Sequence, residues 1–141
     1  MFIEKRFTKL LILTLMGLTL TSCAKIDYND QNALDTLKSS EVDKIVLEYF
    51  DNTVDIESNY KNFNDIIELG SKVKLKSKSN KKYLGGNVIF AKFYKQDKTM
   101  LMLEVRDNHI FVNSVLYKYT KDSKETAKEL EDILASYFQI R

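Results

Sequence analysis

A series of short β-rich runs between Val88 and Thr120 constrains the fold of this chain more than any other feature of its sequence. Polar turns such as Gln96-Asp97-Lys98 and Asp107-Asn108 separate the runs, and a further break falls near Asn113-Ser114. Strands joined by such short turns pair with their chain neighbours in an antiparallel meander. The expected strands are Val88 to Tyr94, Thr99 to Val105, His109 to Val112 and Val115 to Thr120.

Two segments before the meander also have regular patterns. Residues 44–50 alternate around Ile45 and Leu47, which predicts a strand that ends in a turn at Asp51-Asn52. Ser58 is a suitable N-cap for a helix that runs to Leu69, with Gly70 as its C-terminal stop. The apolar face of that helix is expected to contain Tyr60, Phe63, Ile66 and Ile67.

The clearest helix is the last element. Asp122 or Ser123 caps it, and its apolar stripe is formed by Ala127, Leu130, Ile133, Leu134, Tyr137 and Phe138. The order of strand, helix, strands and closing helix predicts an α+β domain, with helices on one face of a mostly antiparallel sheet of about five to six strands. The core is expected to contain Phe50, Phe63, Phe90, Phe93, Phe111 and Phe138.

The first 23 residues have the order of a secretory signal. Lys5, Arg6 and Lys9 precede an uncharged run from Leu10 to Leu20. As a helix this run is about 16 Å long, roughly half the hydrocarbon core of a bilayer. It is therefore too short for a stable membrane-spanning anchor. The tetrapeptide Leu20-Thr21-Ser22-Cys23, with the only cysteine of the chain, resembles the lipobox of bacterial lipoproteins.

The resemblance implies cleavage between Ser22 and Cys23 and a diacylglyceryl group on the Cys23 thiol. The mature protein would then be held outside the cytoplasm by its lipid, at the cell membrane or the outer membrane, because two acyl chains anchor a protein stably. Ala24 after the cysteine implies the outer membrane in a two-membrane bacterium. We expect a signal peptide over residues 1–22, a polar tether over 23–40 and one domain over 41–141.

Removal of the leader makes the chain formally neutral. The whole chain has 22 basic and 20 acidic side chains, and residues 1–22 contain three basic and one acidic, which leaves 19 of each. A general nucleic-acid-binding role would need a clear basic excess, so no nucleic-acid partner is expected.

A local excess of lysine is nevertheless present between residues 72 and 82. The residues from 72 to 78 alternate strictly, which predicts a strand with Val73 and Leu75 on one face and lysines on the other. Such a strip is a possible patch for an anionic ligand, or it protects an edge strand from pairing with other chains. The patch consists of Lys72, Lys74, Lys76, Lys78, Lys81 and Lys82.

The sequence offers little catalytic chemistry. His109 is the only histidine, and its one suitable neighbour in the sequence is Asp107. Asp51, Asp55 and Glu57 lack the spacing of a calcium loop, so no metal or other cofactor is expected. Gly85-Gly86 between two strands indicates a turn rather than a phosphate-binding loop.

Three functions remain open from the sequence. The first is a non-catalytic envelope lipoprotein whose domain binds a protein or an anionic polymer. The second is a structural or assembly subunit of an envelope complex. The third is a small enzyme that uses His109 with Asp107.

Overall fold

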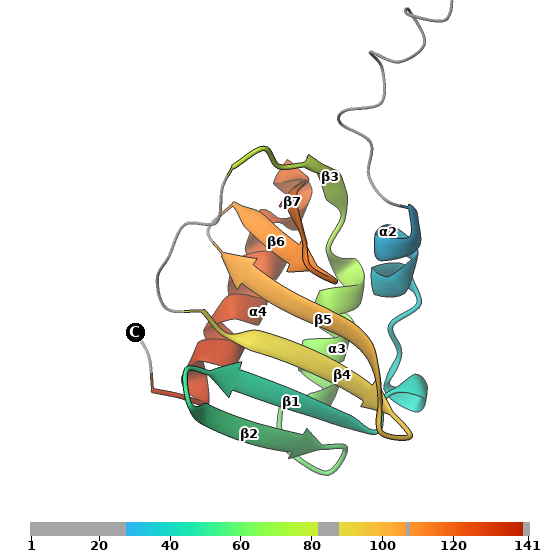
Figure 1. The fold of residues 1–141 in the computed structure, drawn as a ribbon, viewed down its shortest axis with the longest axis vertical. Coiled ribbons are helices and arrows are strands. Elements are labelled where there is room, and N and C mark those ends of the chain that lie inside the picture. The colour runs from blue at the N-terminus through green and yellow to red at the C-terminus, as the bar shows by residue number, and fades with distance from the viewer. Residues whose placement is uncertain (1–27, 82–87, 107, 140–141) are drawn as a thin grey trace, which may run out of the picture.

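The computed structural model describes residues 28–81, 88–106 and 108–139, and it has the predicted α+β architecture (Figure 1). A single antiparallel sheet contains seven strands in the order β2-β1-β4-β5-β6-β7-β3. The strands are β1 (Lys44–Tyr49), β2 (Asn52–Glu57), β3 (Leu75–Lys78), β4 (Phe90–Lys95), β5 (Lys98–Arg106), β6 (His109–Val112) and β7 (Val115–Tyr119). The helices are α2 (Tyr28–Asp35), α3 (Phe63–Lys72) and α4 (Lys124–Ser136), with short 3-10 turns η1 (Ser39–Glu41) and η2 (Lys121–Ser123).

The antiparallel meander is confirmed. Strands β4 to β7 follow one another across the sheet, and β1 pairs with β4 on the other side of β4. Strand β3, which precedes β4 in the chain, instead pairs with β7 at the far edge. This pairing brings residues 75–78 beside residues 117–119, and the candidate site depends on that contact.

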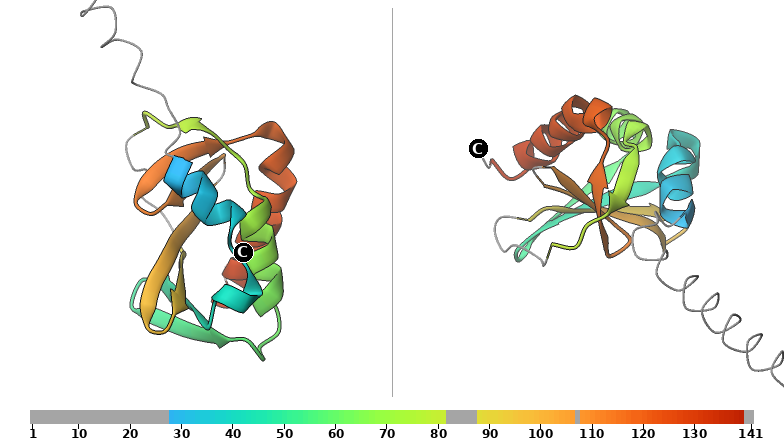
Figure 2. Two further views of the ribbon diagram at one scale, coloured as in Figure 1. Left: turned by 90° about the vertical axis from the view of Figure 1, so that its right-hand side faces the viewer. Right: turned by 90° about the horizontal axis from the view of Figure 1, so that it is seen from above.

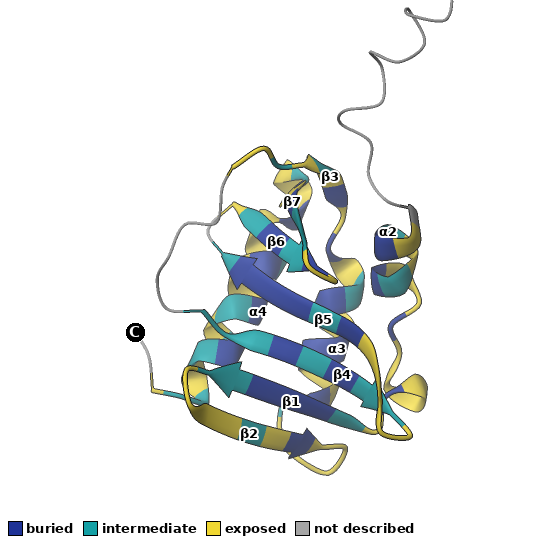
Figure 3. Cartoon of the chain, viewed as in Figure 1, coloured by how far each residue is buried: buried dark blue, intermediate teal, exposed yellow. Residues whose placement is uncertain are grey.

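Helices α3 and α4 lie together on one face of the sheet, and α2 lies beside α3 (Figure 2). Side chains of alternate residues in the strands fill the space between the sheet and the helices, as a two-layer architecture requires. Ile45 and Leu47 of β1 and Leu130 and Leu134 of α4, all predicted to face inward, are buried (Figure 3). The C-terminal helix and its apolar stripe therefore have the role that the sequence predicts.

The sequence analysis missed β2, which makes the sheet larger than expected. Residues 52–57 form a hairpin with β1, in which Val46 faces Asp55 and Leu47 faces Val54. Strand β2 is at the edge of the sheet, and only Ile56 is fully buried, so polar residues fill most of its positions. Asn and Asp are uncommon in strands. The sequence of residues 52–57 therefore resembled a turn more than a strand.

The helix that follows begins later than predicted. Residues 58–62 form turns, and α3 starts at Phe63 after Asn62, which has a left-handed backbone conformation. Tyr60 is exposed as a result and is not part of the packed face. Gly70 does not stop the helix either, since α3 continues to Lys72. A Cβ at Gly70 would lie 3.2 Å from a Leu37 methyl carbon, so the glycine permits close packing at this point.

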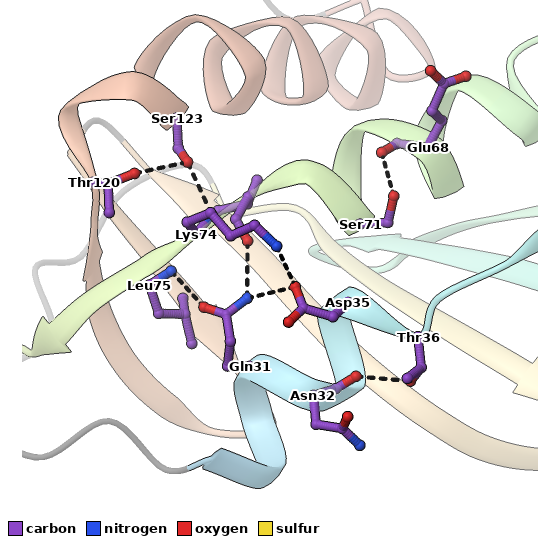
Figure 4. A network of polar contacts seen from close by, with 11 residues as sticks. Gln31, Asn32, Asp35, Thr36, Glu68, Ser71, Lys74, Leu75, Thr120 and Ser123 are labelled. Carbon is purple, nitrogen blue, oxygen red and sulfur yellow. Dashed lines mark hydrogen bonds and ion pairs between the residues drawn. The ribbon is translucent and has the colours of Figure 1, made fainter.

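Residues 28–40 are not a free tether, which corrects the predicted domain boundary. Leu34 and Leu37 are buried in the main core. The Gln31 side chain accepts a hydrogen bond from the Leu75 backbone N–H at 2.7 Å and donates one to the Val73 carbonyl at 3.3 Å (Figure 4). The domain therefore includes α2. Residues 23–27 of the predicted tether lie outside the described residues.

Phe50, which was predicted to lie in the core, does not. It is at the turn between β1 and β2 with a positive φ, and 75% of its side chain is exposed. Its ring contacts the Tyr49 ring edge-on instead of entering the core. Phe63 and Phe93 are fully buried as predicted.

No helix within the described ranges is long and apolar enough to cross a membrane.

Candidate functional site

A pocket of about 410 Å³ lies where β3, β6 and β7 meet the start of α4. Five lysines from separate parts of the chain contribute to its wall. Its lining residues are Lys76, Lys81, Asn108, His109, Lys118, Tyr119, Thr120, Lys121 and Lys124, and we call this group the lysine pocket. Of the lining residues that the structure describes, five are lysines and none is acidic, so this part of the lining is cationic.

Strand pairing places Arg106, His109 and Lys118 in one row across the sheet. Arg106 of β5 faces His109 of β6, and His109 faces Lys118 of β7. Directly paired residues project from the same face of a sheet. Their inward neighbours Val105, Ile110 and Tyr117 are buried under the helices, so this row projects from the opposite face of the sheet.

A β-bulge in β3 decides which lysines of the predicted strip reach the pocket. Leu75 pairs with Tyr119 and Ser77 pairs with Lys118, which leaves Lys76 as the extra residue. Lys76 lines the pocket, whereas Lys78 pairs with Tyr117 and does not. The predicted single-faced row of lysines is therefore wrong, because the bulge shifts the alternation by one residue.

Lys72 and Lys74 do not belong to this strand at all. Lys72 is the last residue of α3, and its ammonium group is 2.5 Å from a Glu68 carboxylate oxygen. Hydrogen bonding to Glu68 raises the pKa of Lys72, and the same contact lowers the pKa of Glu68. Lys74 lies before β3 and pairs with Asp35 at 2.5 Å. Both lysines are therefore neutralised by an acidic partner.

The five lysines of the pocket differ from those two. None forms an ion pair with any residue that the structure describes. All five side chains are exposed. Their charges are thus available to an anion from solution.

Hydrogen bonds fix the backbone at the base of the lysine pocket. The Ser123 hydroxyl accepts a bond from the Lys74 backbone N–H at 2.9 Å and is 3.0 Å from the Thr120 hydroxyl (Figure 4). The Thr120 backbone N–H donates to the Lys74 carbonyl at 2.8 Å. Lys121 and Lys124 therefore project from a short segment whose two ends are held against the chain before β3.

The sequence analysis identified Lys76 and Lys81 of this pocket but missed Lys118, Lys121 and Lys124. Lys118 had a usable signal, because it is the outward residue between Tyr117 and Tyr119 in a predicted strand. Nothing in the sequence indicated that β3 pairs with β7 across a long connection. The other predicted site residues, Ser22, Cys23, Lys82 and Asp107, lie outside the described residues.

His109 is half-buried in the wall of the lysine pocket. Among the lining residues that the structure describes there is no carboxylate and no thiol, and Asp107, the predicted partner of His109, lies outside the described residues. In the described part of the chain there is also no group of three His, Cys, Asp or Glu side chains able to hold a metal. Asp55 and Glu57 are simply exposed residues of β2.

A buried carboxylate lies next to the row formed by Arg106, His109 and Lys118. Glu104 of β5 is only 1% exposed, and one of its oxygens is 3.1 Å from Nε of Arg106. Burial raises the pKa of Glu104, and the Arg106 guanidinium opposes that rise. Phe111 of β6 is the direct cross-strand partner of Glu104. Arg106 therefore has an acidic neighbour on β5, unlike the lysines of the pocket.

Comparison of this chain with protein-family models, with curated proteins and with solved structures finds no match.

Proposed function

We propose that this protein is a lipid-anchored, extracytoplasmic lipoprotein whose small non-catalytic domain binds an anionic component of the cell envelope in the lysine pocket. The observation that carries the proposal is the lysine pocket itself, which joins five lysines and, among its described lining residues, no acid. The anchor rests on the lipobox-like segment that ends at Cys23.

The chemistry of the lining favours an anion with several charges. Lysine ammonium groups act as mobile point charges, whereas arginine gives the planar two-point recognition of a single phosphate or carboxylate. Within the described part of the chain, the pocket is lined by lysines and by no arginine. Its volume of about 410 Å³ is within the range of small-molecule sites and exceeds the space that one phosphate needs. A polymer or surface that presents repeated phosphates fits this arrangement.

Local charge matters more here than net charge. The mature chain is formally neutral, so its binding to anions must come from the pocket and not from the molecule as a whole. Binding of this kind weakens steeply as salt screens the charges.

Titration of the purified, detergent-solubilised protein with inorganic polyphosphate tests the binding part of the proposal. We expect calorimetry to show binding that weakens steeply from low to physiological salt. The triple variant Lys118→Gln, Lys121→Gln, Lys124→Gln should bind at least about tenfold more weakly, because each lysine near an anionic surface contributes about 1 kcal/mol.

A matched control removes the same number of charges elsewhere. Lys38, Lys61 and Lys98 are exposed and do not line the pocket. The triple glutamine variant at these positions should bind polyphosphate almost as the unaltered protein does. Equal losses in both triple variants would contradict a specific site.

Mass spectrometry of the protein from bacterial membranes tests the anchor. We expect Cys23 as the N-terminal residue with its thiol lipidated, and release of a Cys23→Ala variant from the membrane fraction. An unmodified thiol, or residues 1–22 still attached, would contradict the anchor.

A further inference from the structure

We infer that the anion bound by the lysine pocket is the phosphate headgroup layer of the same membrane that holds the lipid anchor. The pocket then fixes the orientation of the domain, with the edge formed by β3 and β7 against the lipid surface. This inference rests on the proposed function, and it names the ligand of that site.

The chain between the anchor and the domain is short. Because α2 belongs to the domain, only residues 24–27 separate Cys23 from Tyr28. Even fully extended, this connection spans at most about 18 Å from the Cα of Cys23 to that of Tyr28. The first residue of α2 is therefore always close to the membrane surface in a lipidated protein.

The start of α2 lies at the same end of the molecule as the lysine pocket. Asp30 accepts a hydrogen bond from the Tyr117 hydroxyl of β7, and Gln31 bonds the backbone at Leu75 of β3. Both strands also contribute to the pocket through Lys76 and Lys118. Figures 1 and 2 show α2, β3, β7 and the start of α4 together at one end of the long axis.

The opposite edge of the sheet is too far away to reach the membrane. Strand β2 is separated from β3 by six strand spacings, or about 29 Å. With the β2 edge on the membrane, the start of α2, which contacts β7 and β3, would be held away from the surface, and the short connection of residues 24–27 opposes this.

Charge reinforces this orientation. The β2 edge has three exposed acids, Asp51, Asp55 and Glu57, and residues 50–57 contain no lysine or arginine. The two edges are separated by several Debye lengths at physiological salt, so they interact independently with an anionic surface. The membrane attracts the pocket edge and repels the β2 edge.

Amine labelling on vesicles tests the inference with the full lipidated protein. The protein is reconstituted into vesicles of phosphatidylcholine alone or with three-tenths phosphatidylglycerol, and each lysine is scored by mass spectrometry after brief acetylation. On the anionic vesicles we expect labelling of Lys118, Lys121 and Lys124 to fall at least about fivefold, because the headgroups cover them. Labelling of Lys61 and Lys98 should be the same on both vesicles.

The triple glutamine variant tests whether the pocket charges hold the domain on the vesicle. In the triple variant Lys118→Gln, Lys121→Gln, Lys124→Gln, the remaining pocket residues Lys76 and Lys81 should be labelled almost equally on both vesicles. If they stay protected on anionic vesicles without the three charges, the pocket does not hold the domain on the surface and the inference is overturned.

The remaining outcomes separate the inference from the proposed function. If pocket lysines react equally on both vesicles while soluble polyphosphate protects them, the pocket binds anions but lipid is not the ligand, so only the inference is overturned. If neither anionic lipid nor polyphosphate protects them, the proposed binding function fails as well. Failure of the protein to stay on phosphatidylcholine vesicles would overturn the anchor and with it the inference.

Discussion

The Tyr117 hydroxyl donates a hydrogen bond to a carboxylate oxygen of Asp30, and this contact joins β7 to α2 inside the protein. Tyr117 is fully buried and Asp30 is 6% exposed. The side-chain amide of Asn113 donates to the other Asp30 oxygen at 3.4 Å. A buried carboxylate is tolerated only where such donors replace water. The N-terminal helix is thus attached through a polar contact that depends on both elements.

Tyr117→Phe should lower the free energy of unfolding by about 2 kcal/mol, because the buried Asp30 side chain loses the hydrogen bond from the Tyr117 hydroxyl. Urea unfolding followed by far-ultraviolet circular dichroism measures this change. Tyr94→Phe is the matched control, since the half-buried Tyr94 hydroxyl has no hydrogen bond to the described residues. Equal midpoints for the two variants would contradict the role of the contact.

Gln31→Ala should expose one edge of β3. The Gln31 amide satisfies the Leu75 N–H and the Val73 carbonyl, groups that an edge strand otherwise leaves open. We expect a loss of about 1 kcal/mol and faster hydrogen exchange at the Leu75 amide, measured by nuclear magnetic resonance. The exposed neighbour Asn32→Ala provides the control for changes in helix propensity. Unchanged exchange at Leu75 in the Gln31 variant would contradict this role.

Truncation tests the corrected domain boundary. A chain that begins at Val42 lacks Leu34 and Leu37, and burial of each leucine contributes about 2 kcal/mol. We expect that chain to be much less stable to urea than one that begins at Asp27, or not to fold at all. Equal stability of the two chains would show that α2 is dispensable and would restore the boundary that the sequence predicted.

The sequence allowed prediction of elements whose pattern is local. Strand β6 begins and ends where predicted, and Ala127, Leu130 and Leu134 of the predicted α4 stripe are buried, because both patterns are set by residues close together in the chain. Tyr137 and Phe138 of that stripe lie beyond the end of α4 and are partly buried. The segment of α2 was predicted as a polar tether because, of its described apolar residues, Leu34 and Leu37 alone are buried deeply, and polar contacts through Gln31 and Asp30 hold the rest. Contacts of that kind leave no periodic signal in the sequence.

The candidate site was predictable only in part for the same reason. Lysines at 76 and 81 were visible as a local cluster, but their neighbours at 118, 121 and 124 join them through pairing of β3 with β7. From the sequence alone, Lys72 and Lys74 were assigned to the same patch as Lys76 and Lys81. Only the fold reveals that Glu68 and Asp35 neutralise these two lysines.

Glu104→Gln should stabilise the protein at neutral pH, and the effect should become smaller in acid. Burial raises the pKa of Glu104 above its ordinary value of 4.5, so the folded state binds this proton more tightly than the unfolded state does. Stability from this group is present below pH 4.5 and is lost as the pH rises through the raised pKa. Glutamine cannot ionise, so we expect the variant to be more stable by about 1 kcal/mol at pH 8, with a smaller difference at pH 4. Urea unfolding across this range measures the difference, and the exposed Glu129→Gln should show none. Lower stability of the Glu104 variant at pH 8 would mean that the ion pair with Arg106 outweighs the cost of burial.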